Sequence, residues 1–428
     1  MKIGFVCSEY FGSKEVNGKL IPTSAHGGFG FLTKVKAEWL AKNGHNVHVF
    51  TYSASFDYEH EKQEVINENW VKVHLIYEKE RVGKGTLSTG LNYLLSKPKG
   101  NSQFRELIIE EGPEILQFED TPTTLLLADI GSIPKVLIFQ DPFDYYDNNL
   151  LLDSEHNYLA LLEGRREQYV LKSESYKFPN EAAINFLHKK NFISPVRKLM
   201  INSRSLRVFA EADFIGEKVK RLFDLGYTPQ TMRNPISIYD KTREKNQKPN
   251  FVWVGRWDPQ KRPDMMLKIA SSIPEYDFYL IGTATKGARD YISIENKLKT
   301  EFSRYPNIHV LGFVDEETKR EYIGKAWALI NTSVREGLPI TFLEAMAEGT
   351  PIVAYVDPDK YVSKFGMRVE YEVEAFKYAI RKVVEEKLHE VTSEKERDFI
   401  RMEHEVSSVM KKHLEIYNAI FDGEQNAL

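Results

Sequence analysis

The chain of 428 residues is predicted to be an α/β protein with two doubly wound domains. Three observations support this prediction. Apolar strand patterns alternate with helical patterns in two blocks, which indicates parallel sheets covered by helices on both faces. A mostly charged stretch, 240–249, separates the blocks and has the composition of a linker. The length and the 42% hydrophobic content suit domains with sizeable cores.

The first block, residues 1–245, is interpreted as the N-terminal domain. Its first strand is followed by a long loop and then by an amphipathic helix that carries Val35, Trp39 and Leu40. Asn43-Gly44 ends that helix before the next strand. The predicted strands are 2–7, 46–52, 71–76, 114–118, 136–139 and 207–210.

The second block, residues 246–402, is interpreted as the C-terminal domain. Pro339 suits a first helical position, because its φ is preset and it has no amide hydrogen to leave unpaired, so we expect a helix over 339–347 that Gly349 stops. Past residue 371 the chain is expected to be helical, with a last helix near 403–421. The predicted strands are 250–254, 277–281, 307–311, 328–331 and 351–355.

Composition and charge narrow the class of protein. A formal net charge of −4 gives no overall attraction to nucleic acid, so phosphate binding must be local. The single cysteine, Cys7, lies in the first predicted strand, which excludes an internal disulfide and favours a reducing compartment. No secretion signal is recognised and no apolar run approaches ~18 residues, so we expect a cytoplasmic protein.

The most informative stretch contains two glutamates eight positions apart, Glu336 and Glu344. Glu336 is expected in a loop with Gly337, Leu338 and Pro339. Glu344 should lie in the helix that follows, roughly 8 Å further along its axis. Loop amides and the positive end of the helix favour an anion at this place. A nucleoside diphosphate with a sugar on one side and a ribose on the other would fit two carboxylates so spaced; the alternative is a helix cap and a surface carboxylate that share the spacing by chance.

A second patch follows the strand 250–254. Gly255 and Arg256 begin the turn between this strand and an apolar helix, and Lys261 lies near its end. Turns at the carboxyl ends of parallel strands are where ligands bind. Arginine and lysine there would offset charge on a diphosphate. The alternative is an exposed basic turn, and Arg262 is expected to be a solvated neighbour.

A third patch is the glycine-rich stretch at 27–30. Gly28 and Gly30 would let the backbone approach a phosphate at the start of a helix. The spacing is not the dinucleotide fingerprint, because the loop from Cys7 is too long for that tight turn. A plain flexible loop is the alternative.

The sequence EGLPITFLEAMAEGTPIVA at 336–354, with Val254-Gly255-Arg256 and Lys261, closely resembles the retaining nucleotide-sugar glycosyltransferases of family 4, also called group 1. The resemblance implies the GT-B fold, with two Rossmann-like domains facing a central cleft. It implies that Glu336 contacts the donor sugar, that Glu344 holds the ribose, and that Arg256 and Lys261 bind the diphosphate. It also implies that Gly28 and Gly30 face the donor and that the last helix, about 403–428, joins the N-terminal domain.

The acceptor side is less defined. His26, Glu119, Asp141 and Asp144 are candidates, because they lie beside the glycines or follow predicted strands. Turn formation or helix capping is the alternative for the acidic residues. Many family members carry a histidine near the end of the strand 136–139, and this chain does not. Asp357-Pro358-Asp359 resembles a metal-binding pattern, but its prolines favour a turn, and no metal site is predicted.

Residues 188–207 hold six basic side chains and no acidic one, interleaved with apolar residues. Such a stretch would suit peripheral contact with an anionic membrane. The alternative is a solvated helix face that covers the core.

The function implied by the resemblance is transfer of a sugar from a UDP- or GDP-linked donor to a carbohydrate or lipid-linked acceptor, with retention and without a metal or other cofactor. Three rivals stay open: a phosphorylase, a nucleotide-sugar epimerase, and a catalytically silent nucleotide-sugar binder. The presence of Glu336, Glu344, Arg256 and Lys261 together argues against the silent binder.

Overall fold

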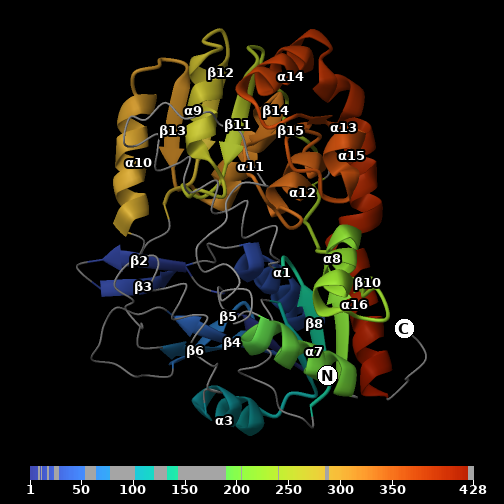
Figure 1. The fold of residues 1–428 in the computed structure, drawn as a ribbon. Coiled ribbons are helices and arrows are strands. Elements are labelled where there is room, and N and C mark those ends of the chain that lie inside the picture. Colours follow the sequence, from blue (N-terminus) through green and yellow to red (C-terminus); the bar gives the residue numbers. More distant parts are fainter. Residues whose placement is uncertain are drawn as a thin grey trace. The chain divides into compact units, whose positions relative to one another are not determined.

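The computed structural model describes residues 1–7, 10, 12–16, 19–23, 28–53, 64–77, 102–119, 133–142, 189–203, 205–239, 241–284 and 289–422. These residues fall into two compact units (Figure 1). Unit 1 contains the described parts of Met1–Pro142, Phe178–Pro235 and Val406–Leu428. Unit 2 contains those of Ile236–Glu405. The sequence places the boundary near residue 245 and begins the last helix near 403, whereas this division falls after Pro235 and after Glu405.

Unit 1 is built on a sheet with the strand order β10-β9-β8-β7-β1-β4-β6-β5. All neighbours are parallel except β5 and β6, which pair antiparallel at one edge. That edge strand is absent from the sequence prediction. The strands are β1 Lys2–Cys7, β4 Asn46–Ser53, β5 Glu64–Glu68, β6 Val71–Tyr77, β7 Ile115–Phe118, β8 Lys135–Phe139, β9 Leu206–Ala210 and β10 Gln230–Thr231.

Helices cover both faces of this sheet. Side chains of one alternate set, such as Phe5 and Val49, form a core with Leu40 of α1 and Tyr417 of α16. On the other face, His48 lies against Glu111 of α3, and Phe139 packs on Phe223 of α8. The helices of unit 1 are α1 Gly28–Lys42, α3 Ser102–Glu111, α7 Ser194–Asn202, α8 Asp213–Phe223 and α16 Val406–Phe421.

The long loop predicted after Cys7 is a point where the sequence prediction was wrong. The structure forms an antiparallel hairpin there, with β2 at Gly12–Val16 and β3 at Lys19–Thr23. The sequence Asn17-Gly18 lies between these strands. Asn-Gly is the dipeptide that most favours a two-residue hairpin turn, so the missed signal was local turn chemistry.

Unit 2 contains a fully parallel sheet with the strand order β13-β12-β11-β14-β15-β16. The five predicted strands are present, and β16 is a two-residue addition at the edge, too short to give a sequence pattern. The strands are β11 Asn250–Val254, β12 Asp277–Ile281, β13 Ile308–Gly312, β14 Ala328–Asn331, β15 Ile352–Ala354 and β16 Met367–Arg368.

The helices of unit 2 enclose an aromatic core. Trp253, Trp257 and Phe302 pack edge to face in it and are at most 2% exposed. Pro339 caps α12 rather than occupying its first turn, with φ −63°. The helices are α9 Pro263–Ser271, α10 Arg289–Phe302, α11 Glu316–Lys325, α12 Ile340–Ala347, α13 Tyr361–Phe365, α14 Val373–Glu385 and α15 Leu388–His404.

The strand order of unit 2 identifies where a ligand is expected. From β11 the chain continues to β12 on one side, whereas β14 lies on the other side of β11. Ligands of open α/β sheets bind outside the carboxyl ends of the strands at such a reversal. The loops that leave β11 and β14 there contain Arg256, Lys261 and Glu336.

Candidate functional site in unit 2

The loops after β11 and β14 lie against each other, although they are about 75 residues apart in sequence. The backbone amide of Val334 donates to the carbonyl of Gln260 at 3.0 Å. The side chain of Gln260 donates to the carbonyl of Arg335, also at 3.0 Å. These bonds hold the turn after β11, which contains Lys261, against the loop after β14, which contains Glu336.

Lys261 and Glu336 form an ion pair at this junction. The Lys261 Nζ lies 2.6 Å and 2.7 Å from the two carboxylate oxygens, and Asn331 donates to Oε1 at 3.3 Å. Only 7% of the Glu336 side chain is exposed. Burial acts to raise the pKa of this carboxyl, but the charge and hydrogen bonds of Lys261 outweigh it and hold the pKa below 4.5. Glu336 is therefore an oriented anion at neutral pH.

Glu344 lies in α12, and its two carboxylate oxygens have different surroundings. Lys319 of α11 donates to Oε1 at 2.8 Å. The other oxygen, Oε2, is buried and has no hydrogen-bond partner among the described residues. Burial raises the pKa of Glu344, and Lys319 opposes that rise only in part. A buried carboxylate oxygen without a donor is costly, so it suits a ligand that brings a hydroxyl group.

Arg256 and Lys261 both contact the carboxylate of Asp258 in the turn after β11. The Arg256 Nε lies 2.9 Å from Asp258 Oδ2, and the Lys261 amide donates to Oδ1 at 3.0 Å. The Arg256 side chain is 49% exposed. The turn thus presents an accessible guanidinium at one end and an ion-paired ammonium at the other.

Arg262 was predicted to be a solvated neighbour, and that prediction was wrong. The side chain is completely buried and makes two hydrogen bonds of 2.8 Å and 2.7 Å to the buried carboxylate of Asp264. Its guanidinium also lies 5.8 Å from the ring centre of Tyr371. The charge tolerates burial because Asp264 neutralises it with two-pronged geometry.

The remaining residues of unit 2 that were predicted to bind the donor lie in the same loops. Leu338 is 4% exposed, while Gly337 and Pro339 are partly exposed. The Gly255 amide donates to the carbonyl of Ile281 at 3.0 Å. Asp357, part of the pattern that resembles a metal site, accepts from the amide of Val362 in the first turn of α13 at 2.9 Å.

In unit 1 the structure places some of the candidates at the start of α1. Gly28 and Gly30 lie in its first turn, where Gly28 is exposed and Gly30 is buried. His26 and Asp144 lie outside the described residues. Asp141 follows β8, and its Oδ1 lies 3.6 Å from the Nζ of Lys218 on α8.

Glu119 follows β7 and is completely buried. Lys36 of α1 lies 2.8 Å from both carboxylate oxygens, and Gln140 donates to Oε2 at 3.0 Å. Asn234 joins Gln140 to the buried Glu211. Sequence reasoning missed this network, although each of Glu119, Gln140 and Glu211 directly follows a strand. The network anchors α1 to the carboxyl edge of the sheet.

The described part of the basic stretch, 189–203 and 205–207, spans three elements. These are a π-helical turn at Lys189–Ile193, α7 and β9, and Val196 and Met200 of α7 are buried. Arg197 points back to the carbonyl of Phe223 at 2.8 Å, whereas Lys189 and Lys198 are exposed. Among the described residues, no helix is long and apolar enough to cross a membrane.

These motifs can be compared with known proteins. Residues 248–386 match the family model described as "Glycosyl transferases group 1". The matched segment contains Arg256, Lys261, Glu336 and Glu344. The O-antigen biosynthesis glycosyltransferase WbnH of Escherichia coli is 30% identical over 124 residues, which are 29% of this chain and 33% of that protein. The probable O-antigen biosynthesis glycosyltransferase WbiN of Escherichia coli matches equally. The chain thus spans about a third of the length of these curated relatives.

Solved structures match over nearly the whole chain. Sucrose-phosphate synthase from Thermosynechococcus elongatus has a TM-score of 0.68 at 14% identity, covering 98% of this chain and 99% of that one. Anabaena Alr3699/HepE in complex with UDP-glucose has a TM-score of 0.60 at 13% identity, covering 98% and 100%. WaaG, a glycosyltransferase involved in lipopolysaccharide biosynthesis, has a TM-score of 0.60 at 15% identity, covering 97% and 99%. The predicted two-domain α/β fold of the GT-B type is confirmed.

Sequence reasoning missed one glycine in the group 1 segment. Gly282 follows β12 with φ +124°, and a Cβ built on it would lie 1.9 Å from the carbonyl oxygen of Gly255. Its amide donates to Gly312 at 2.8 Å. The signal in the sequence was the position of Gly282 directly after the strand predicted at 277–281. Gly282 lets the backbone after β12 approach the turn that begins at Gly255 closely.

Gly282→Ala is expected to destabilise unit 2 by on the order of 2 kcal/mol, because the new methyl group meets backbone atoms at a φ that favours glycine. Gly312→Ala is the matched control, since Gly312 also has a positive φ of +70° but open space around its Cβ position. Urea unfolding of both variants measures the difference. Equal stabilities would show that the contact with Gly255 imposes no constraint.

Proposed function

We propose that this chain is a retaining, family 4 glycosyltransferase that moves a sugar from a UDP- or GDP-linked donor to an acceptor hydroxyl. The observation that carries the proposal is the junction of the two loops of unit 2. Cationic Lys261 and anionic Glu336 meet there, and the same segment holds Glu344 with its buried oxygen Oε2 unsatisfied. The match of residues 248–386 to the group 1 family model supports it.

The contacts of each side chain suggest which part of the donor it binds. The Glu344 Oε2 accepts a hydrogen bond from a ribose hydroxyl, which satisfies the buried oxygen. Glu336, held as an anion, accepts hydrogen bonds from hydroxyls of the donor sugar. Lys261 and the accessible Arg256 contact the diphosphate.

The sugar transfer then proceeds through a loose transition state. The bond between the sugar C1 and the phosphate oxygen breaks, and its electron pair stays on the diphosphate. Arg256 and Lys261 stabilise that negative charge as it develops. The acceptor oxygen bonds to C1 from the face that the diphosphate leaves, and the acceptor hydroxyl transfers its proton to an oxygen of the departing diphosphate. With two cations at the leaving group, we propose that the reaction needs no metal ion.

The acceptor is proposed to be a saccharide of cell-surface polysaccharide synthesis, free or lipid-linked. The curated relatives named for O-antigen biosynthesis support this class. A cytoplasmic location, with peripheral membrane contact through the exposed lysines of α7 and the turn before it, belongs to the same proposal.

A thermal-shift screen tests the nucleotide part. The full chain is heated with UDP, GDP, ADP and their common sugar conjugates, with and without magnesium. A ligand at 100 times its Kd should stabilise the fold by about 2.7 kcal/mol. Assays with and without a saccharide acceptor, and with inorganic phosphate, then distinguish a transferase from an epimerase and a phosphorylase. The anomeric configuration of the product, measured by NMR, tests retention.

Glu344→Gln is expected to weaken binding of the responding nucleotide by about 10-fold or more, because a hydrogen bond to a charged group contributes about 1.5–3 kcal/mol. Glu374→Gln, at a glutamate 80% exposed on α14, is the control and should bind normally. Isothermal titration calorimetry measures both. Unchanged affinity in Glu344→Gln would remove Glu344 from the nucleotide site.

A further inference from the structure

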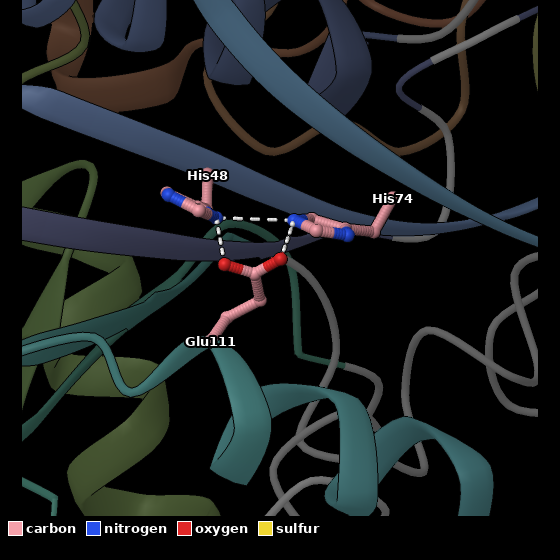
Figure 2. Close-up of side chains that lie close together, drawn as sticks. All are labelled: His48, His74 and Glu111. Atoms are coloured by element: carbon pink, nitrogen blue, oxygen red, sulfur yellow. Dashed lines mark hydrogen bonds and ion pairs between the residues drawn. The ribbon is translucent and has the colours of Figure 1, made fainter. Parts of the chain in front are cut away.

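His48, His74 and Glu111 form a cluster in unit 1 that the proposed sugar transfer does not use. His48 lies in β4 and His74 in the neighbouring strand β6, on the face that α3 covers. Glu111 is the last residue of α3 (Figure 2). Figure 2 shows its carboxylate facing the two ring nitrogens from below the strands. Three elements thus direct one donor group each to a common point.

The separations of these atoms match the edges of a metal coordination shell. His48 Nδ1 and His74 Nε2 are 3.0 Å apart. Glu111 Oε2 lies 3.4 Å from His48 Nδ1, and Oε1 lies 3.6 Å from His74 Nε2. Ligands about 2.0–2.1 Å from a tetrahedral zinc ion are about 3.3 Å from one another. We propose that His48, His74 and Glu111 bind a zinc-like divalent transition-metal ion, with water as the fourth ligand.

The contacts around His48 prepare its ring for this role. His48 Nε2 lies 3.1 Å from the side-chain oxygen of Asn46, which can only accept a hydrogen bond. Nε2 therefore carries the proton, and the lone pair of Nδ1 points to the cluster. Ligand histidines are commonly oriented by such a second hydrogen bond. Stacking on Phe50, at 4.9 Å between ring centres, holds the His74 ring in place.

The two rings are shielded from solvent. His48 and His74 are at most 2% exposed. Glu111 stays accessible, with 17% of its side chain exposed.

Two lysines share the Glu111 carboxylate. Lys72 lies 2.5 Å from Oε1 and Lys2 lies 3.5 Å from Oε2. The Lys72 side chain is 38% exposed, so it can move into solvent when a cation binds. Imidazole nitrogens favour zinc, cobalt or nickel over magnesium and calcium. Because the ligands join α3 to β4 and β6, the ion stabilises this packing, independently of the donor site in unit 2.

The test uses the full chain, stripped with a chelator and titrated with Zn²⁺ alone. We expect one Zn²⁺ per chain by calorimetry and a higher melting temperature, with no such response to Mg²⁺. Co²⁺ should give the intense visible absorption of a tetrahedral site. Failure of the wild-type chain to bind one Zn²⁺, or a weak octahedral Co²⁺ spectrum, would overturn the proposal.

Two variants locate the ion. His74→Phe keeps a ring against Phe50 but removes the nitrogen, and Glu111→Gln keeps the shape but removes the charge. Each is expected to lose more than about 100-fold in Zn²⁺ affinity. His309→Gln is the control, since His309 lies 3.4 Å from Asp277 in unit 2 and tests adventitious binding at a His–Asp pair. Wild-type affinity in both Glu111→Gln and His74→Phe would place the ion elsewhere and overturn the assignment.

Discussion

Lys261→Ala is expected to lower the turnover number for the proposed sugar transfer by at least ~100-fold, because in that proposal it removes a positioned cation from the leaving diphosphate. The structure adds a second consequence. Lys261 is bonded to both oxygens of Glu336, so its removal leaves a nearly buried carboxylate without its counter-charge. Glu336→Ala should lower turnover by a similar factor, since the donor sugar loses its oriented acceptor of hydrogen bonds.

The measurement must separate chemistry from folding. Turnover, KM and melting temperature are determined for both variants and for Glu336→Gln, which keeps the side-chain shape. Lys325→Ala is the matched control, because the Lys325 side chain on α11 is 44% exposed and forms an ion pair with Glu321 of the same helix. Near-normal turnover in a folded Lys261 or Glu336 variant would exclude that residue from the mechanism.

Glu396 is expected to make the stability of unit 2 fall as pH rises toward 8. This side chain of α15 is completely buried; Thr392 donates to Oε1, and Oε2 has no partner among the described residues. Desolvation raises the pKa of Glu396 from 4.5 to about 8, against the opposing effects of Thr392 and the charge of Lys245.

The direction follows from proton linkage. Between pH 4.5 and about 8, the folded state keeps a proton on Glu396 that the unfolded state has lost. The free energy of unfolding therefore decreases with pH in this window, by about 1.4 kcal/mol per pH unit. From pH 5 to pH 8 the loss is on the order of 4 kcal/mol. Desolvation lowers the pKa of Lys245 to about 8, so its opposite contribution appears above that pH.

Glu396→Gln should abolish this decline, since a neutral amide replaces the group that titrates. Urea unfolding from pH 5 to pH 8 measures the free energy of unfolding of wild type and variant. Glu390→Gln is the control on the same helix, because the Glu390 side chain is 58% exposed. Parallel pH profiles of wild type and Glu396→Gln would contradict the assignment, and Lys245→Met separates the lysine's own effect.

The sequence alone predicted the architecture of unit 2 well. Its central strands β11, β14 and β15 are almost entirely buried, so they are mostly apolar runs that can be recognised without their distant partners. Asn250–Val254 and Ala328–Asn331 were predicted with the observed bounds. Glu344 of α12 and Glu336 in the loop before it were recognisable from the sequence, because Gly337 and Pro339 fix the local backbone between them. In unit 1 the hairpin after Cys7 and the antiparallel edge strand were missed, because their signals are short turns.

Which side chains meet was decided by the tertiary structure. Lys261 and Glu336 were predicted as separate contacts, yet β11 and β14 are neighbours and bring the two into one ion pair across 75 residues. Arg262 is buried because its guanidinium pairs with the carboxylate of Asp264, which neutralises its charge. His48, His74 and Glu111 carry no spacing pattern, since strand pairing and the packing of α3 bring them together. Local sequence therefore determined the elements and their motifs, whereas burial and pairing of charge depended on contacts between residues far apart in the chain.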